Sequence, residues 1–228
     1  MARALDDATL VAQKRDAAAR AAALVAPGMT VGLGSGSTAL LAVEALGRRV
    51  ADGSLADVVG IPTSRATAEF ARARGLTLTD LERRPVVDLA IDGADEVDAD
   101  GGMLKGAGGA LVREKIVARA ARRFVVVVDE SKGVDRLGRR HPLAVAVDPF
   151  GWSTHLQAVR GMGAEPVLRR QGSGRPYATD DGYFILDCRF PDGIVDPEAV
   201  ERKLKSRPGV VDTGLFLGFR PEVIVGRI

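Results

Sequence analysis

The side chains best suited to chemistry are concentrated between Ile91 and Lys115. Asp92 and Asp95 supply two carboxylates at the start of this stretch. Lys105 follows with an ammonium group, and Glu114 adds a third carboxylate near the end. A carboxylate that removes a proton from carbon works best beside groups that stabilise the negative oxygen formed in the reaction. This combination of residue types therefore predicts a proton-transfer site.

The flanking sequence predicts elements that would position these groups. The apolar run 86–91 is typical of a buried parallel strand, and it places Asp92 at the carboxyl end, where open α/β sheets bind ligands. The glycine-rich segment 106–109 would let backbone N–H groups approach a ligand, and the apolar periodicity from Ala110 onward predicts a helix. Because a helix N-terminus favours anions, an anionic substrate is expected.

Glu114 falls in the first turn or so of that helix. At about 100° per residue it points roughly 130° from the centre of the apolar stripe, so it is expected outside the core. An ordinary surface glutamate that satisfies the helix dipole is the alternative interpretation. The expected stripe consists of Val112, Ile116, Val117, Ala120 and Phe124.

A second candidate binding loop follows the predicted strand 30–34. Its residues are Ser35, Gly36, Ser37 and Thr38, which open a helix over 39–46. Hydroxyls and free N–H groups between a strand and a helix suit a phosphate or carboxylate. A dinucleotide fingerprint would need glycine at position 37, and a Walker loop would need a lysine, so a small anion is expected rather than a nucleotide. A turn without a ligand is the alternative.

The composition is that of an ordered globular protein, with 46% apolar and 27% charged residues among 228. Lys and Arg number 32 against 30 Asp and Glu, without a basic block, so no nucleic-acid partner is expected. No apolar segment is long enough to span a bilayer and the N-terminus lacks a signal-peptide core, so we expect no membrane partner and a cytoplasmic location.

The few cysteine and histidine residues predict neither a disulfide nor a metal site. Cys188 is the single cysteine and lies in a predicted strand, so a buried thiol is expected. His141 and His155 are not at metal-ligand spacing and are expected to be ordinary surface or domain-junction residues.

The order of elements predicts an α/β fold with two domains. Strands at 30–34, 57–61, 77–80, 86–91 and 124–128 alternate with helices, beginning with one over 5–25, and predict a Rossmann-like, doubly wound, mostly parallel sheet. From about Gly138 the order becomes βαββαβ, which matches a smaller ferredoxin-like α+β domain. We expect the large domain to comprise 1–138 and 211–228, with two apolar runs in 214–225 returning to its sheet, and the small one 139–210.

Five motifs together resemble the ribose-5-phosphate isomerases of the A type, in the same order and over nearly the whole chain. They are Val31–Ala39, Asp92–Glu96, Lys105–Lys115, Asp129–Lys132 and Gly209–Val211. The resemblance implies an aldose–ketose isomerase of the non-oxidative pentose phosphate pathway, which interconverts ribose 5-phosphate and ribulose 5-phosphate. It also implies that no metal or organic cofactor is used and that the chain forms a homodimer or homotetramer.

The resemblance assigns roles to individual residues. Glu114 would move the proton between C1 and C2 through an enediolate, Lys105 would stabilise the substrate oxygen, and Asp92 and Asp95 would hold sugar hydroxyls and help to open the ring. Lys14, on the polar side of the first helix, and Lys132 would serve the phosphate end. The remaining expected substrate contacts are Ser35, Gly36, Ser37, Thr38, Gly93, Ala94, Gly106, Ala107 and Gly108.

Two departures and two alternatives accompany this assignment. The family often has Thr at the position of Ser35 and Gly at that of Ala107, but neither change removes a needed hydroxyl or N–H group. A related sugar-phosphate deaminase or coenzyme A transferase is the enzymatic alternative. A sugar-phosphate sensor without catalytic activity is the other alternative, and it would need a DNA-binding segment for which the chain has no spare residues.

Overall fold

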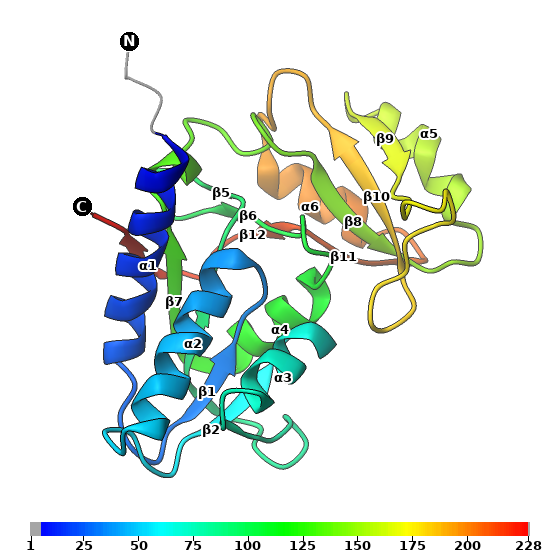
Figure 1. Cartoon of the computed structure of the whole chain (residues 1–228). Helices are drawn as coiled ribbons and strands as arrows, with labels where there is room; N and C mark the ends of the chain where they lie inside the picture. The colour runs from blue at the N-terminus through cyan, green and yellow to red at the C-terminus, as the bar shows by residue number, and fades with distance from the viewer. Residues whose placement is uncertain (1–5, 228) are drawn as a thin grey trace. The chain divides into compact units, whose positions relative to one another are not determined.

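The computed structural model describes residues 6–227, which divide into two compact units (Figure 1). The first unit contains residues 6–94, 116–132 and 220–227, and the second contains residues 95–115 and 133–219. The boundary at 115/116 falls inside one helix, α4 (Leu111–Ala120).

The first unit is built on a six-stranded sheet in which every strand pair is parallel. Its spatial order is β13-β7-β4-β1-β2-β3, which corresponds to the 3-2-1-4-5-6 order of doubly wound α/β folds. The predicted α/β architecture with a mostly parallel sheet is therefore confirmed. The strands are β1 (Thr30–Leu33), β2 (Val59–Pro62), β3 (Thr77–Leu78), β4 (Val87–Asp92), β7 (Ala121–Val128) and β13 (Glu222–Val225).

Helices cover both faces of this sheet because successive strand residues point in opposite directions. Val31 and Leu33 of β1 face the core formed with α1 (Asp7–Ala23) and α2 (Ser37–Ala51), which lie side by side in Figure 1. Gly32, between them, faces α4, and a Cβ there would lie 2.5 Å from Val117 Cγ1. The absence of a side chain at residue 32 lets α4 approach the sheet closely.

The helix ends follow local capping chemistry. Asp6 caps α1 by accepting a hydrogen bond from the Thr9 amide at 2.8 Å, and Leu5, the expected first helical residue, lies outside the described residues. Ser64 caps α3 (Arg65–Arg72) in the same way, through the Thr67 amide at 3.0 Å. A short 3₁₀ turn, η1 (Glu130–Lys132), follows β7.

The second unit contains two antiparallel sheets. The larger has the order β11-β8-β10-β9 and the chain order βαββαβ. The smaller has the order β12-β6-β5. Their elements are β5 (Glu96–Val97), β6 (Met103–Leu104), β8 (Leu143–Val147), η2 (Trp152–Thr154), α5 (His155–Arg160), β9 (Glu165–Leu168), β10 (Phe184–Arg189), α6 (Pro197–Lys205), β11 (Val210–Thr213) and β12 (Leu215–Phe216).

The C-terminal tail corrects one expectation. Of its two apolar runs, β13 pairs with β7 in the parallel sheet as expected, but β12 pairs with β6 instead. Strand β6 is only two residues long and carries no alternating pattern, so sequence periodicity could not reveal this partner.

Glu96 fixes the segment that leads into the larger sheet of the second unit. Its side chain is fully buried and accepts hydrogen bonds from the backbone amides of Gly138 at 2.6 Å, Arg140 at 2.7 Å and His141 at 2.6 Å. A carboxylate held by three N–H donors is satisfied without a counter-cation. Glu96 therefore has a structural role, which is to hold the backbone of residues 138–141.

The cysteine prediction is confirmed, but the prediction for one histidine is wrong. Cys188 is completely buried on β10, and burial raises the pKa of its thiol. His155, expected at a surface or a domain junction, is also buried, because Gly209 leaves room for the ring and Arg207 covers it. Within residues 6–227, no helix combines the length and the apolar character that crossing a membrane requires.

The buried histidine makes stability depend on pH. Burial, and next to it the charge of Arg207, lowers the pKa of His155. As the pH falls below about 6.5, His155 becomes protonated in the unfolded chain but stays neutral in the folded protein. The free energy of unfolding therefore decreases. We expect a loss of at most about 1.4 kcal/mol per pH unit from this residue. Urea unfolding between pH 7.5 and 5.5 should show a smaller loss in His155→Gln, and equal losses would contradict the assignment.

Candidate functional site

In the first unit, Asp92 lies where the strand order of the parallel sheet reverses, between β4 and β1. Ligands of open α/β sheets bind outside the carboxyl ends of the strands at this position. The Gly34 amide donates to the Ile91 carbonyl at 2.9 Å, which continues the pairing beyond β1. The amides of Ser35 and Gly93 then donate to Asp92 Oδ1 at 3.2 and 2.8 Å. The buried carboxylate is thereby fixed to the loop that follows β1.

The hydroxyl of Ser35 joins three others, from the turn after β2 and the first turn of α3. Its Oγ lies 2.8 Å from Thr63 Oγ1, 2.9 Å from Ser64 Oγ and 3.1 Å from Thr67 Oγ1. The sequence analysis singled out Ser35 but gave no role in this site to Thr63, Ser64 or Thr67. Since β1 and β2 are parallel neighbours, the turns at their C-terminal ends are adjacent. The predicted parallel order of these strands could therefore have pointed to the hydroxyl residues after β2.

The N-terminus of α2 follows directly after Ser35. Gly36 occupies the N-cap position with φ of 99°, a conformation that favours glycine, and it has no side chain with which to cap the helix. Ser37 and Thr38 are the first helical residues, so their N–H groups belong to the first turn. N–H groups at such a helix N-terminus are suited to an anion, and anion binding by residues 35–38 stays a prediction.

The two predicted phosphate-binding lysines belong to neighbouring segments of the first unit. Lys14 on α1 directs its Nζ to Asp129 Oδ2 at 3.7 Å, and its side chain is one-quarter exposed. The Lys132 amide donates to the Asp129 carbonyl at 3.2 Å, which closes the η1 turn. Gln13 strengthens this contact because its Oε1 accepts a hydrogen bond from the Glu130 amide at 3.2 Å. Asp129 therefore links the helix that carries Lys14 to the turn that carries Lys132.

In the second unit, Lys105 and Glu114 form a buried ion pair. Lys105 Nζ lies 3.4 Å from Glu114 Oε2, and the two side chains are only 4% and 6% exposed. Lys105 follows β6 directly, and its amide donates to the Gly214 carbonyl at 2.9 Å. Glu114 lies in the first turn of α4. The predicted base and the predicted oxyanion-stabilising cation are therefore brought together, largely shielded from water.

The expected orientation of Glu114 is wrong. Glu114 is buried on the same face as Leu111 and Val117, whereas Ile116, expected in the core, is 52% exposed. Lys105, which follows β6, contacts this face of α4 at Glu114. The apolar pattern of the helix alone could not reveal that contact. Phe124, the last residue of the expected stripe, belongs to β7.

The two cations adjacent to Glu114 in sequence are engaged by other acids. Arg113 forms a bidentate pair with Asp181, with Nε–Oδ2 at 2.9 Å and Nη2–Oδ1 at 2.5 Å, and these hydrogen bonds raise the pKa of Arg113. Lys115 Nζ lies 2.7 Å from Asp212 Oδ1. Arg113 and Lys115 are therefore paired with carboxylates other than Glu114, and the cation beside Glu114 within this unit is Lys105.

The ring of Phe216 lies near both lysines. It is completely buried on β12, with its centroid 5.6 Å from Lys105 Nζ and 5.0 Å from Lys115 Nζ. An aromatic face attracts cations at this range. Phe216 thus contributes to keeping two ammonium groups in a largely apolar environment.

Asp95 is attached to the glycine-rich loop that follows Lys105. Its amide donates to the Leu104 carbonyl at 2.8 Å, and its Oδ2 accepts a hydrogen bond from the Ala107 amide at 3.0 Å. Ala107 and Gly108 are exposed, while Gly106 is buried. Gly93 and Ala94 are half-buried, and they belong to the first unit together with Asp92.

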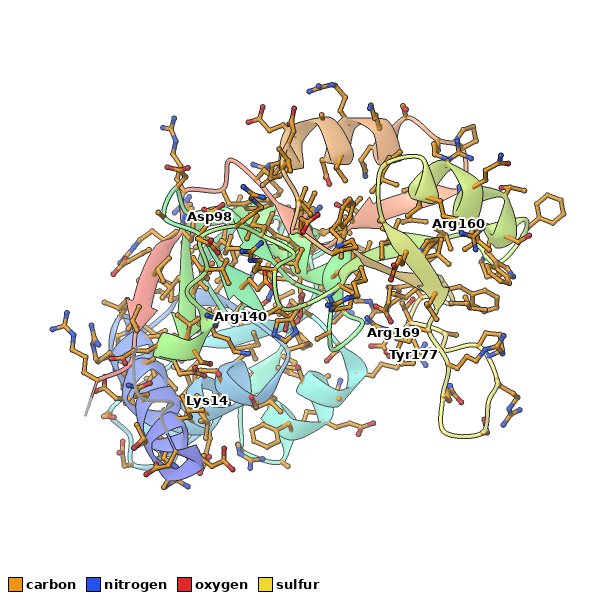
Figure 2. The ribbon with its side chains drawn as sticks, turned by 90° about the horizontal axis from the view of Figure 1, so that it is seen from above. Lys14, Asp98, Arg140, Arg160, Arg169 and Tyr177 are labelled. Carbon is orange, nitrogen blue, oxygen red and sulfur yellow. The ribbon has the colours of Figure 1, made fainter. Side chains whose placement is uncertain are left out.

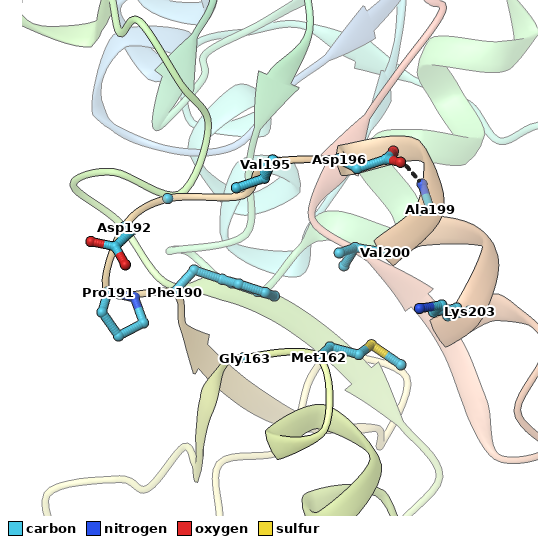
Figure 3. Close-up of a pocket in the computed structure, with 11 residues that line it drawn as sticks. Met162, Gly163, Phe190, Pro191, Asp192, Val195, Asp196, Ala199, Val200 and Lys203 are labelled. Carbon is cyan, nitrogen blue, oxygen red and sulfur yellow. Dashed lines mark hydrogen bonds between the residues drawn. The ribbon is translucent and has the colours of Figure 1, made fainter.

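A separate cavity of about 460 Å³ lies in the second unit (Figure 3). Met162, Phe190 and Val200 line it, with Asp192 and Lys203 among its polar residues. None of its lining residues belongs to the predicted site. Within the described part of the chain, no group of three or more His, Cys, Asp or Glu side chains is arranged to hold a metal ion.

Comparisons with known proteins identify the relatives of this chain. Residues 59–228 match the family model described as ribose 5-phosphate isomerase A (phosphoriboisomerase A). The ribose-5-phosphate isomerase A of Roseiflexus castenholzii is 50% identical over 93% of this chain and 90% of the relative. That of Thermomicrobium roseum is 51% identical over 93% of this chain and 89% of the relative.

Solved structures agree with these sequence matches. A D-ribose-5-phosphate isomerase in complex with phospho-erythronic acid superposes with a TM-score of 0.90, at 37% identity and 93% coverage of both chains. The ribose 5-phosphate isomerase A of Methanocaldococcus jannaschii gives a TM-score of 0.87, at 39% identity and 94% coverage of both chains.

The close approach at Gly34 is a test of the loop after β1. A Cβ at Gly34 would lie 2.2 Å from Asp92 Oδ1 and 2.6 Å from Asp92 Cα, and the backbone contact cannot be relieved by a side-chain rotation. We expect Gly34→Ala to destabilise the protein by about 1–3 kcal/mol, an overpacking cost. Thermal unfolding should show a drop of several degrees relative to Gly172→Ala, since Gly172 has open space around it. Equal melting temperatures would contradict the close packing.

Proposed function

The chain belongs to the ribose 5-phosphate isomerase A family, and we propose that Glu114 and Lys105 carry out its interconversion of ribose 5-phosphate and ribulose 5-phosphate. This is an aldose–ketose isomerisation of the pentose phosphate pathway. The supporting observation is the 3.4 Å separation of two almost fully buried, oppositely charged groups. The relatives and structures compared above are all named as isomerases, so the deaminase, coenzyme A transferase and sensor alternatives are not favoured.

The proposed chemistry moves one proton between adjacent carbons. The Glu114 carboxylate removes the proton from C2 of the open-chain aldose, the electrons move toward the carbonyl oxygen, and an enediolate forms. Glu114 then returns the proton to C1 while the proton of the C2 hydroxyl passes to O1, which gives the ketose and regenerates the carboxylate. The Lys105 ammonium is suited to stabilise the negative oxygen, because electrostatic interactions are stronger where water is excluded.

The other predicted residues receive supporting roles. Asp92 and Asp95 hold sugar hydroxyls and take part in ring opening, and the fixed positions of both carboxylates support this role. Substrate contacts also come from Ser35, Gly36, Ser37, Thr38, Gly93, Ala94, Gly106, Ala107 and Gly108. The proposed phosphate ligands are Lys14 and Lys132, supported by their shared contact with Asp129. Binding energy at a remote phosphate helps to orient the reacting carbons.

We also infer that the βαββαβ segment forms a ferredoxin-like domain over about residues 139–210. Its sheet order, which is 4-1-3-2 in chain order, supports this inference. The corresponding large domain would comprise 1–138 and 211–228. The compact units differ from these bounds, because residues 95–115, 133–138 and 211–219 belong to the second unit. A cytoplasmic location, a homodimer or homotetramer, and the absence of nucleic-acid and membrane partners remain predictions from the sequence.

Replacing the proposed base provides the direct test. Glu114→Gln keeps the shape of the side chain and removes the carboxylate, so kcat for ribose 5-phosphate should fall by about 10²–10⁴-fold, with a much smaller change in KM. The matched control is Glu201→Gln, a partly buried glutamate on α6 that contacts Lys115, and it should keep kcat near that of the wild type. Unchanged turnover in Glu114→Gln would remove Glu114 from the mechanism.

Isotope exchange tests the proton path independently. A proton held on a carboxylate exchanges with solvent, so reaction in D₂O should place deuterium on the carbon that receives the proton. Nuclear magnetic resonance of the sugar phosphates after many turnovers would detect it. Active enzyme whose product and recovered substrate contain no solvent deuterium would rule out a free enediolate path while leaving the isomerase activity intact.

A further inference from the structure

The loop after Lys105 is shaped by glycines that no other residue could replace without strain. Gly106 has φ of 116°, and a Cβ there would lie 2.7 Å from Ala144 Cβ. Gly109 has φ of 80°, and a Cβ there would lie 2.3 Å from Tyr177 Oη. Residues of the larger sheet and its connections therefore press directly against the loop, all within the second unit.

Arg169 binds this loop through its backbone. The residue follows β9, and its Nη1 donates to the carbonyl oxygens of Gly106 at 3.0 Å and Ala107 at 3.1 Å. The rest of the guanidinium is fixed by Asp187 on β10, with Nε–Oδ2 at 2.9 Å and Nη2–Oδ1 at 2.5 Å. The side chains of Arg169 and Asp187 are only 16% and 25% exposed, so the pair is well shielded for a charged group near the surface.

Tyr177 supplies a second support on the same loop. Its hydroxyl donates to the Gly108 carbonyl at 3.4 Å, and its ring centroid lies 5.7 Å from the Arg169 guanidinium carbon. Figure 2 shows the two side chains next to each other. Three consecutive carbonyl groups, those of residues 106, 107 and 108, are thus held by two side chains.

Holding these carbonyls also sets the direction of the amides. In a planar trans peptide the C=O and N–H groups point in opposite directions. Because Arg169 binds the Gly106 carbonyl, the Ala107 N–H points away from the guanidinium, and it donates to Asp95 Oδ2 at 3.0 Å. The Ala107 carbonyl fixes the Gly108 N–H in the same way. A cation on the carbonyl side also polarises the peptide and strengthens its N–H as a donor.

We propose that Arg169, oriented by Asp187, is a positioning residue that sets the loop Lys105–Gly109 for the substrate, with Tyr177 as a second support. The inference rests on the proposed function, because the loop carries Lys105 and the expected substrate contacts at Gly106, Ala107 and Gly108. Arg169 does not need to touch the sugar. It acts by fixing the direction of Ala107 and Gly108 N–H and, through Ala107, the position of Asp95.

Arg170 offers a matched control one residue away. Its Nη1 donates to the Gly174 carbonyl at 2.7 Å, in the exposed turn between β9 and β10, and its contact leaves residues 105–109 untouched. Arg169→Gln and Arg170→Gln remove the same charge from the same segment. A general effect of charge or of a weakened hairpin would appear in both variants, whereas a loop-positioning effect would appear only in the first.

The closing experiment combines kinetics with amide exchange. At a temperature well below unfolding, Arg169→Gln should lower kcat for ribose 5-phosphate by about ten- to a hundredfold, with a smaller rise in KM, because misplaced groups slow the chemical step. Arg169→Lys keeps the positive charge and should recover part of the loss. Recovery should be incomplete, because one ammonium cannot bind two carbonyls and Asp187 together. Asp187→Asn should act in the same direction, and the double variant should be no slower than Arg169→Gln alone.

Hydrogen–deuterium exchange separates this inference from the proposed function. The amides of 106–109 should exchange faster in Arg169→Gln than in the wild type or in Arg170→Gln, whether or not the enzyme turns over the sugar. Kinetics and exchange equal to those of Arg170→Gln would overturn the positioning role. An inactive wild type with the expected exchange pattern would instead contradict the proposed function. If Arg169→Gln fails to fold, Tyr177→Phe provides the same comparison with a smaller expected loss.

Discussion

The arrangement of the second unit depends on one buried ion pair. Removing a carboxylate and an ammonium from water costs several kcal/mol for each ion, and their attraction compensates only when the geometry is good. Lys105 Nζ and Glu114 Oε2 reach 3.4 Å because Lys105 directly follows β6 and Glu114 lies in the first turn of α4. A loop of glycines joins these two elements. The constraint therefore extends from the two charges to the backbone that connects them.

Protein groups around the ion pair prevent competing interactions. Arg113 and Lys115 flank Glu114 in sequence but are paired with Asp181 and Asp212. Glu96, the most deeply buried acid of the same unit, is saturated by three backbone amides. These neighbouring charged groups have partners of their own. Lys105 and Glu114 therefore stay paired with each other in a position shielded from water.

In the first unit, polar groups lie at the carboxyl end of the parallel sheet. Asp92 is fixed by the amides of the loop after β1, and the hydroxyl of Ser35 belongs to a cluster of four. Gly34 permits this approach because any side chain there would collide with Asp92. Rigid strand ends, rather than long loops, thus position the polar groups, which suits a reaction that depends on precise orientation.

Local sequence determined the parallel sheet and the candidate residues, because alternation, turn residues and short motifs act over a few positions. It misjudged Glu114 and His155, since helical periodicity cannot report which distant segment covers a face. It also gave no hint of Arg169, whose partners at Gly106 and Ala107 are more than 60 residues away in the chain. Which side chains meet a charged group depends on contacts made only after the chain has folded, so the tertiary structure alone decided them.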